Sequence, residues 1–415
     1  MSMLSVLINA YACAPNKGSE PGMAWNWVIN LAKYCKVYVI TEGEWKDEIE
    51  IALKELPQGE NIMFYYNPLS EKIRKMCWNQ GDWRFYYYYR KWQKKTLLLA
   101  VEIIKSNPID VIHQLNMIGF REPGFLWEIE NKPFIWGPIG GMKNFPKAYA
   151  ENASLKIKIF IKLKNIINIF QIKNDIRVKN ALLRANLLVS AIPETQNLIL
   201  KHYSLKSELI SETGCYVKHY DKSNLNRFID DLTFDILWVG KFDFRKQLGL
   251  ALKTISNLKH LPGIKFHLVG TGSLEQIKDY KSLVNELGLN DIVVWHNVIS
   301  NTKVLELMEK SHLFFFTSVS EDTSTVVLEA LSCNLPVLCF NACGFGPLID
   351  TSVGMKIEFS NINKSINEFA EKIQYLYENR DVLLTFSENC FSRQQELSWD
   401  SKAQQMMELR SEEHT

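Results

Sequence analysis

Short apolar runs alternate with longer helical patterns along the chain, and this alternation is the strongest constraint on the fold. Strands that are buried on both faces read as continuous apolar runs, and strands separated by helices form parallel sheets. In the first half the apolar runs are 4–10, 37–41, 61–67, 111–115, 133–137 and 187–192. A helical pattern over Met23–Tyr34 separates the first two runs. The first half therefore predicts an α/β domain with a parallel sheet.

The same series begins again after a polar stretch at residues 215–233. The apolar runs of this second series are 234–240, 266–270, 292–297, 312–318, 336–340 and 354–358. A chain of 415 residues is also too long for one ordinary hydrophobic core. We therefore predict an N-terminal domain over 1–214, a linker over 215–233 and a second domain over 234–385. Doubly wound domains of this kind bind ligands in a cleft at the carboxyl ends of their strands.

Composition narrows the class of protein and its compartment. Hydrophobic residues make up 47% of the chain and charged residues 23%, which is typical of a soluble globular protein. The formal net charge is only +2, so any charged binding surface must be local. No apolar window is long enough for a signal peptide or a membrane span, so we expect a cytoplasmic protein. The eight cysteines form no C-x-x-C pair and the histidines do not cluster with them, which predicts reduced thiols and no metal site.

Two carboxylates stand eight positions apart in the stretch SVSEDTSTVVLEA, residues 318–330. Between them, after a predicted strand, lies a predicted helix start with hydroxyl caps and free amides, formed by Thr323, Ser324, Thr325 and Val326. Such a helix start is an anion site, and Glu321 and Glu329 at its two ends can accept hydrogen bonds from sugar and ribose hydroxyls. Loop decoration by Glu321 and a solvated Glu329 are the alternative interpretation of this spacing.

The stretch from 318 to 340 resembles the E-x7-E signature of retaining glycosyltransferases of family 4, of the type that builds bacterial cell-surface polysaccharide. The signature has a serine three residues before the first acid, here Ser318, and Leu-Glu-Ala at the second acid. The Gly-x-Pro-Val that usually follows is replaced here by Cys333-Asn334-Leu335-Pro336-Val337. The resemblance implies the GT-B fold, with two facing Rossmann-like domains and an interdomain cleft. It also implies that a C-terminal helix over 386–415 packs back on the first domain.

The loop WVGKFDFRKQLGL, residues 238–250, resembles the VGRLxxRKG loop of the same family, whose basic residues hold the donor diphosphate. Lys246 and Arg245 match those basic residues, whereas Lys241 and Gln247 stand in place of the usual arginine and glycine. A solvated basic turn is the alternative. The position of this loop directly after a buried strand favours a binding site.

Glycines after three other predicted strands match loops that approach the donor in this family. They are Gly270, Gly272, Gly344 and Gly18, with Gly346 and Gly22 as close neighbours. A glycine allows the backbone to approach a ligand, but a tight turn is an equally simple reason for it.

His113 stands in DVIHQLN, at the predicted end of a strand of the first domain. The family often has a histidine at this strand end, close to the transferred sugar. The alternative is a structural histidine that is satisfied by a neighbouring carbonyl group. The resemblance places His113 with the catalytic residues.

Two segments combine many basic residues with aromatic or apolar ones. Residues 71–95 contain eight basic, eight aromatic and two acidic residues, and residues 151–185 contain eight basic and two acidic residues. Such surfaces lie on anionic membranes or grip single-stranded nucleic acid, and helix faces packed against the domain are the alternative. Because the resemblance points to a sugar transferase, we expect peripheral membrane contact and no nucleic acid.

The resemblance implies a retaining glycosyltransferase that moves a hexose-type sugar from a UDP- or GDP-linked donor to a glycan or lipid-linked acceptor. It also implies no cofactor, no essential metal and a place at the inner face of the cell membrane. Lys246 and Arg245 would neutralise the leaving diphosphate, Glu321 would contact the transferred sugar, and Glu329 would hold the ribose. Another GT-B enzyme, such as a nucleotide-sugar epimerase or a soluble sugar-phosphate synthase, and a non-catalytic two-lobed sugar-binding protein are the alternatives. The sequence assigns neither the donor sugar nor the base.

Overall fold

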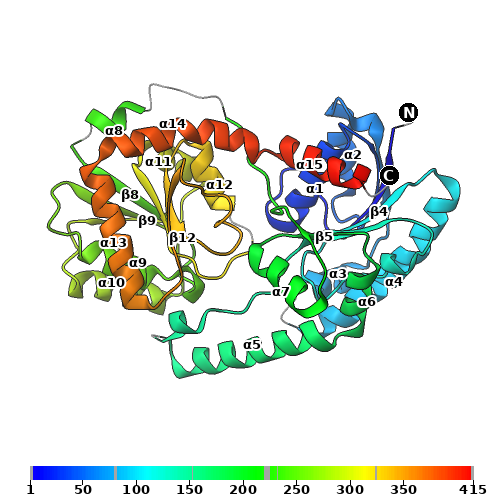
Figure 1. The fold of residues 1–415 in the computed structure, drawn as a ribbon, viewed down its shortest axis with the longest axis horizontal. Helices are drawn as coiled ribbons and strands as arrows, with labels where there is room; N and C mark the ends of the chain where they lie inside the picture. Colours follow the sequence, from blue (N-terminus) through cyan, green and yellow to red (C-terminus); the bar gives the residue numbers. More distant parts are fainter. Residues whose placement is uncertain are drawn as a thin grey trace. The chain divides into compact units, whose positions relative to one another are not determined.

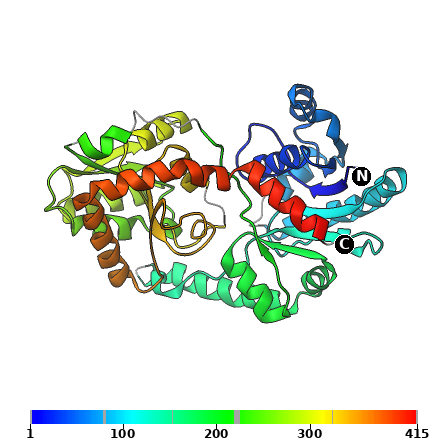
Figure 2. The same ribbon diagram turned by 45° about the horizontal axis from the view of Figure 1, so that its top comes forward.

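The computed structural model describes residues 3–78, 82–151, 153–218, 225–230, 232–322 and 325–412. Within these residues the chain forms two α/β units, each built on a parallel sheet with helices around it (Figures 1 and 2). Unit 1 comprises Met1–Lys143, Ile166–Glu212 and Trp399–Thr415, and unit 2 comprises Asn144–Asn165 and Thr213–Ser398. The prediction of two Rossmann-like parallel sheets is confirmed.

The sheet of unit 1 has the strand order β3-β2-β1-β4-β5-β6-β7, and all neighbouring strands are parallel. Its strands are β1 (Ser5–Ala10), β2 (Lys36–Thr41), β3 (Ile62–Tyr66), β4 (Val111–Asn116), β5 (Phe134–Ile139), β6 (Leu187–Ser190) and β7 (Glu208–Leu209). The central strands β1, β4 and β5 are buried at every position, as their continuous apolar character predicts. The order changes direction between β1 and β4, which is the switch point at which ligands bind in such sheets.

Helices connect the strands of unit 1, and the last helix of the chain also belongs to this unit. They are α1 (Ser19–Leu31), α2 (Lys46–Glu55), α3 (Glu71–Trp78), α4 (Trp83–Ser106), α6 (Ile176–Arg184), α7 (Pro193–Tyr203) and α15 (Trp399–Glu412). The helix α1 begins four residues before the predicted Met23, because a proline fits the first turn of a helix. The helix α15 packs on α1, where Trp27 and Trp399 meet edge to face with ring centroids 5.9 Å apart.

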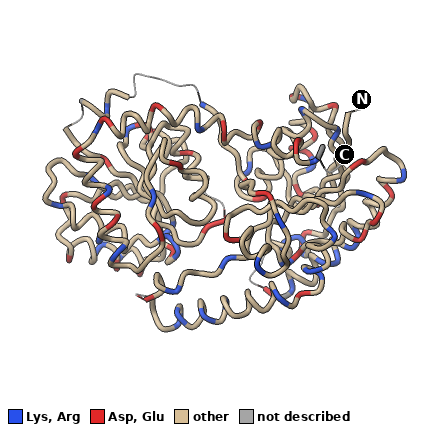
Figure 3. Tube along the Cα trace, viewed as in Figure 1, with Lys and Arg blue, Asp and Glu red and all other residues tan. Residues whose placement is uncertain are grey.

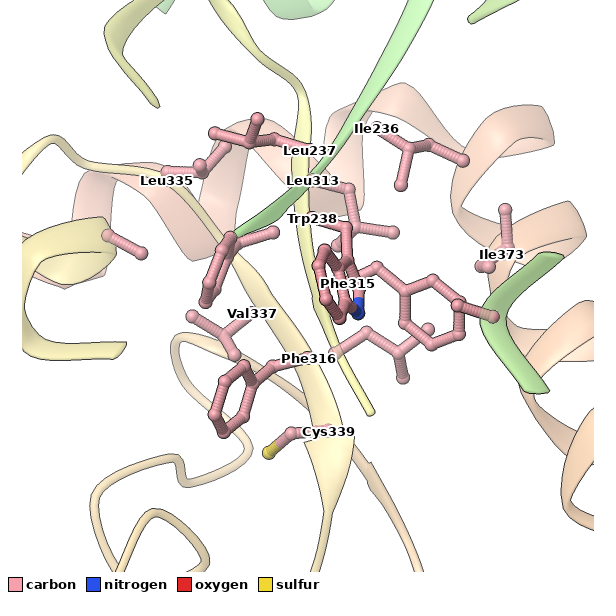
Figure 4. Packing of buried hydrophobic residues seen from close by; sticks show 14 of the residues in the cluster. Ile236, Leu237, Trp238, Leu313, Phe315, Phe316, Leu335, Val337, Cys339 and Ile373 are labelled. Carbon is pink, nitrogen blue, oxygen red and sulfur yellow. The ribbon is translucent and has the colours of Figure 1, made fainter. Parts of the chain in front are cut away.

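The sheet of unit 2 has the order β10-β9-β8-β11-β12-β13 and is also entirely parallel. Its strands are β8 (Phe234–Val239), β9 (Ile264–Val269), β10 (Val293–Asn297), β11 (Leu313–Phe316), β12 (Val337–Phe340) and β13 (Gly354–Ile357). The switch point of this sheet lies between β8 and β11. Figure 4 shows Trp238 of β8 packed among Phe315 and Phe316 of β11, in a core that fixes the ends of both strands.

The helices of unit 2 are α8 (Arg227–Asp230), α9 (Leu248–Ser256), α10 (Leu274–Glu286), α11 (Asn301–Lys310), α12 (Thr325–Ser332), α13 (Ile362–Glu378) and α14 (Arg380–Glu396). Two of them fall where the predicted boundaries differ from the structure. The helix α8 lies in the predicted linker, yet Arg227 is buried and donates through Nε to the carbonyl of Ser311 at 2.9 Å. The predicted C-terminal segment divides at residue 398, so that α14 belongs to unit 2 and α15 to unit 1.

Residues 144–165, which the sequence assigns to the first domain, pack with unit 2. Tyr149, in the short helix η3 (Lys147–Ala150), is fully buried against Phe340 and Phe359. Its hydroxyl lies 2.7 Å from the hydroxyl of Ser365 and accepts the amide of Ser360 at 3.1 Å. The long helix α5 (Leu155–Asn174) follows this anchor directly.

Candidate functional site

The loops after β8 and β11 meet at the switch point of unit 2, and two of the predicted site residues form an ion pair there. Lys246 ends the short helix η5 (Phe244–Lys246), and Glu321 follows β11. The Lys246 Nζ lies 2.8 Å from Glu321 Oε1, and the two side chains are 17% and 15% exposed. The ammonium group also lies 4.9 Å from the centre of the Phe316 ring. Lys246 is therefore held between an acid and an aromatic face.

Hydrogen bonds lock the two loops together around this ion pair. The Ser318 hydroxyl lies 2.9 Å from Glu321 Oε1, and the amide of Val319 donates to the carbonyl of Arg245 at 2.9 Å. Thr317 Oγ1 donates to the carbonyl of Lys246 at 2.8 Å and accepts Trp238 Nε1 at 3.0 Å. A buried tryptophan thereby fixes the backbone that carries Lys246.

Gln247 occupies the position where the family usually has glycine. Its φ of +52° lies in the left-handed region that glycine favours. The Gln247 side-chain amide donates to the carbonyls of Tyr149 at 3.2 Å and Phe244 at 2.9 Å. The first bond ties the basic loop to the buried Tyr149, and the second closes a turn within the loop itself.

Arg245, the second predicted cation, pairs with Asp243 within the same loop. The Arg245 Nη2 lies 2.9 Å from Asp243 Oδ2, and Asp243 also accepts the Arg245 amide at 2.8 Å. Burial works against the ionised form of Asp243, but the bonds from Arg245 outweigh it and lower the pKa of this carboxyl group. The same bond, with the charges of Glu321 and Asp322, raises the pKa of Arg245. The Arg245 side chain is 48% exposed and open to an anion.

The predicted glycines after β9 pack against the basic loop. Gly270 has a φ of +144°, and a Cβ placed on it would lie 1.8 Å from the carbonyl oxygen of Gly240. A Cβ on Gly272 would lie 2.6 Å from Gln276 Oε1. The amide of Phe242 donates to the carbonyl of Thr271 at 2.8 Å. Gly270 is therefore required for the close approach of two backbone segments beside Lys246, whereas Gly272 makes room for the side chains of Gln276 and Phe242.

Glu329 lies on α12 and makes a hydrogen bond to the first residue of α11. Its Oε1 accepts Asn301 Nδ2 at 3.1 Å. Burial raises the pKa of Glu329, against the opposing effects of Asn301 and Lys218. Sequence reasoning missed Asn301 because no motif links a residue 28 positions earlier to the second acid.

The structure describes three of the five remaining donor residues predicted for this unit. The helix α12 begins at Thr325, which is exposed, and continues with the half-buried Val326, whereas Thr323 and Ser324 lie outside the described residues. Gly344 is buried in the turn after β12.

In unit 1 the steric need for glycine falls on Gly22 and not on Gly18. Gly18 is the N-cap of α1, and a Cβ there would meet no atom within 4 Å. A Cβ on Gly22 would lie 1.9 Å from the carbonyl oxygen of Lys17. Glu20 Oε1 accepts the amide of Ile118 at 3.2 Å and so connects the loops after β1 and β4.

His113 lies inside β4 and not at its end, and both of its ring nitrogens are engaged. Nε2 donates to the carbonyl of Gly137 at 2.6 Å, and Nδ1 accepts the Arg410 guanidinium of α15 at 2.7 Å. Burial, helped by the charge of Arg410, lowers the pKa of His113 to about 3. The ring is fully buried and neutral, so the geometry supports the structural alternative for His113 over the catalytic role.

Because of His113, we expect the free energy of unfolding to be about 2 kcal/mol lower at pH 5 than at pH 7. The pKa of His113 is about 3 in the folded protein and 6.5 in the unfolded chain. The unfolded chain therefore binds more protons between pH 7 and pH 5, and the folded state loses stability as the pH is lowered. Denaturant titrations of the wild type and His113→Gln at both pH values measure the effect. A variant that loses as much stability as the wild type on acidification would contradict it.

The comparison with known proteins identifies the unit that holds the ion pair. Residues 225–393 match the family described as "Glycosyl transferases group 1". Unit 2 contains a group 1 glycosyltransferase domain. The glycosyltransferase domain includes both β8 and β11 with their loops, and therefore Lys246 and Glu321. The expectation of a transferase enzyme is confirmed at the level of this domain.

Two curated proteins match only part of the chain. The N-acetylgalactosamine-N,N'-diacetylbacillosaminyl-diphospho-undecaprenol 4-alpha-N-acetylgalactosaminyltransferase of Campylobacter jejuni is 28% identical over 152 residues, which are 35% of this chain and 40% of the relative. The D-inositol 3-phosphate glycosyltransferase of Arthrobacter is 24% identical over 150 residues, which are 35% of each chain. The match thus spans less than half the length of either relative.

Solved structures share the fold over nearly the whole chain. A glycosyltransferase from Rickettsia africae has a TM-score of 0.62 at 17% identity and covers 100% of both chains. Anabaena HepE in complex with UDP has a TM-score of 0.61 at 14% identity and covers 99% of this chain and 100% of its own. WaaG, a glycosyltransferase involved in lipopolysaccharide biosynthesis, has a TM-score of 0.56 at 17% identity. The match covers 97% of this chain and 98% of WaaG. These likenesses show the GT-B fold.

The described residues provide neither a metal-ligand cluster nor a helix suited to cross a membrane. Among these residues, no group of three or more His, Cys, Asp or Glu side chains is placed to hold a metal ion. No helix within the described ranges combines the length and apolar character that a membrane span needs.

Proposed function

We propose that the protein is a retaining glycosyltransferase of family 4, which moves a hexose-type sugar from a UDP- or GDP-linked donor to a glycan or lipid-linked acceptor. The observation that carries this proposal is the Lys246–Glu321 ion pair at the switch point of the glycosyltransferase domain. HepE structures contain UDP and UDP-glucose, and the Campylobacter relative is named for a diphospho-undecaprenol substrate. These names support a nucleotide-sugar donor and a lipid-linked acceptor.

In the proposed reaction the protein stabilises the charge that develops on the leaving diphosphate. Lys246 and Arg245 supply two cations within one turn, so the reaction needs no metal ion or cofactor. The fixed backbone around Thr317 and Ser318 keeps Lys246 in place without reorganisation during the reaction. Retention follows if the acceptor hydroxyl attacks the anomeric carbon on the face that the diphosphate leaves. The bond from this carbon to the diphosphate breaks, the leaving diphosphate takes the hydroxyl proton, and no covalent enzyme intermediate forms.

The two acids of the E-x7-E motif recognise hydroxyl groups in this proposal. Glu321 accepts hydrogen bonds from the transferred sugar next to the diphosphate, and Glu329 accepts those of the ribose. The cellular setting that we propose is cell-surface polysaccharide synthesis at the inner face of the membrane, with the protein bound peripherally.

Incubation of the protein with radiolabelled UDP- and GDP-sugars and a membrane extract tests this function. We expect label to enter a glycan or lipid fraction, with unchanged rate in EDTA, and NMR of the product to show the anomeric configuration of the donor. An inverted product would refute retention. Transfer to a soluble sugar phosphate without membrane extract would indicate the synthase alternative, and no transfer from any donor would refute the assigned activity.

A further inference from the structure

The helix α5 exposes a row of large apolar side chains along most of its length. We define the α5 outer face as Leu155, Ile159, Phe160, Leu163, Ile166, Ile167 and Phe170, each more than half exposed. With 3.6 residues per turn, this face lies opposite the buried line of Ile161, Asn165 and Ile172. A contiguous apolar face of this kind marks an interaction site, because isolated exposed apolar residues are common but clustered ones are not.

Three amide side chains of α5 turn toward the protein, whereas the uncharged polar residues of a surface helix usually face water. Asn165 donates to the carbonyl of Phe145 and accepts its amide, both at 3.0 Å. Asn168 is buried, and its amide donates to a backbone carbonyl of the preceding loop at 2.6 Å. Gln171 accepts Arg121 Nε at 2.6 Å. These three amide groups attach the helix to the rest of the protein by hydrogen bonds, and the large apolar side chains on the opposite side are exposed to solvent.

The charge of α5 is entirely positive. The helix contains five lysines and no acidic residue, and Figure 3 shows basic positions along its trace. From the helical spacing, Lys158, Lys162 and Lys173 border one edge of the α5 outer face and Lys164 borders the other. Lys156 lies on the face itself, at its N-terminal end. Lysine stems can lie along an apolar surface while their ammonium groups reach neighbouring anions.

The first basic and aromatic segment of the sequence does not share this arrangement. In α4 the aromatic side chains of Phe85, Tyr89 and Trp92 are buried, and they form a satellite core with Tyr11. Core packing thus accounts for Phe85, Tyr89 and Trp92 of α4, and Tyr87 is the one large apolar side chain near them that is more than half exposed among the described residues of 82–92. Core packing does not account for the α5 outer face.

We propose that the α5 outer face binds an anionic lipid bilayer, with the helix lying in the plane of the membrane. Apolar side chains flanked by lysines match an acyl and headgroup boundary that carries negative phosphates. The absence of acidic residues from α5 favours this partner over a protein surface of mixed charge. The inference rests on the proposed function in one respect, since it names the surface through which the enzyme reaches a lipid-linked acceptor.

Flotation of the full-length protein with vesicles tests this surface without any sugar substrate. We expect the protein to float with phosphatidylcholine vesicles that contain phosphatidylglycerol, and to float less with pure phosphatidylcholine or at high salt. The double variant Phe160→Ser/Phe170→Ser should lower binding to anionic vesicles by roughly tenfold or more. The double variant Lys158→Glu/Lys162→Glu should lose the preference for anionic vesicles.

Exposed apolar residues elsewhere provide the matched control. Ile51 and Leu98 are 61% and 67% exposed, and Ile51→Ser/Leu98→Ser should float like the wild type. The proposal is overturned if the wild type stays unbound to anionic vesicles, or if both serine variants bind equally. A sedimentation experiment in which the phenylalanine variant turns a dimer into a monomer would assign the face to self-association instead.

The outcome separates this inference from the proposed function. Vesicle binding without sugar transfer to any acceptor would refute the proposed function and leave the surface established. Transfer to a detergent-solubilised lipid-linked acceptor without vesicle binding would refute the surface and leave the function established.

Discussion

Lys246→Ala is expected to lower the rate of sugar transfer by roughly 10²- to 10³-fold, the range found when one preorganised group that stabilises developing charge is removed. The ammonium group is 2.8 Å from Glu321 Oε1 and 17% exposed, so solvent does not readily replace its charge. Transfer from the labelled donor measures the effect.

The fold of Lys246→Ala must remain intact for this result to bear on catalysis. Removal of Lys246 leaves the Glu321 carboxylate, which is 15% exposed, without its cation, so we expect a lower melting temperature and measure transfer well below it. Lys259→Ala removes an exposed lysine outside the loop and should transfer at the wild-type rate. Transfer by folded Lys246→Ala within threefold of the wild type would contradict the assignment of Lys246.

Gly270→Ala is expected to destabilise the protein by about 3 kcal/mol or more. The new methyl group would lie 1.8 Å from the carbonyl oxygen of Gly240, and the φ of +144° is closed to other residues. Relief of this clash requires movement of the backbone that leads to Lys246, so transfer should fall as well. Denaturant unfolding of the variant measures the first effect.

Gly249→Ala is the matched control on α9. A Cβ there would make ordinary contacts at 3.9 Å with Tyr280 and 4.0 Å with Leu283. Alanine is favoured over glycine in a helix by up to about 1 kcal/mol, so this variant should be as stable as the wild type or more stable. Equal unfolding midpoints for Gly270→Ala and Gly249→Ala would refute the steric argument.

The strands could be predicted because parallel strands are buried on both faces and leave long apolar runs. The run 4–10 became β1 (Ser5–Ala10), and 336–340 became β12 (Val337–Phe340). The short edge strand β7 (Glu208–Leu209) has one exposed and one half-buried residue, so it leaves no apolar run to detect. Local periodicity finds central strands and misses short edges.

The partners of His113 could not be predicted from its neighbourhood. Arg410, which donates to its ring, is 297 positions away on the last helix. A motif records where a side chain stands on its strand, but not which distant helix covers it. The same limit applies to Tyr149, whose hydroxyl group bonds to Ser360 and Ser365, 211 and 216 positions later.

The Lys246–Glu321 ion pair, by contrast, follows from topology. Both residues come directly after strands that flank the switch point, and carboxyl ends of parallel strands share one edge of the sheet. The sequence could not show how the two basic segments differ, because α4 and α5 are similar in composition. Burial in the structure shows that α5, and not α4, turns a row of apolar residues outward.

Calorimetric titration of UDP and GDP into the wild type and Lys246→Ala tests most directly that a nucleotide diphosphate binds beside Lys246 in the glycosyltransferase domain. One nucleotide should bind the wild type with a stoichiometry of about one, and the variant should bind it at least roughly tenfold more weakly, since a charge-assisted contact of about 1.4 kcal/mol or more is lost. If neither nucleotide binds the wild type, or if the variant binds with unchanged affinity, the diphosphate does not lie beside Lys246.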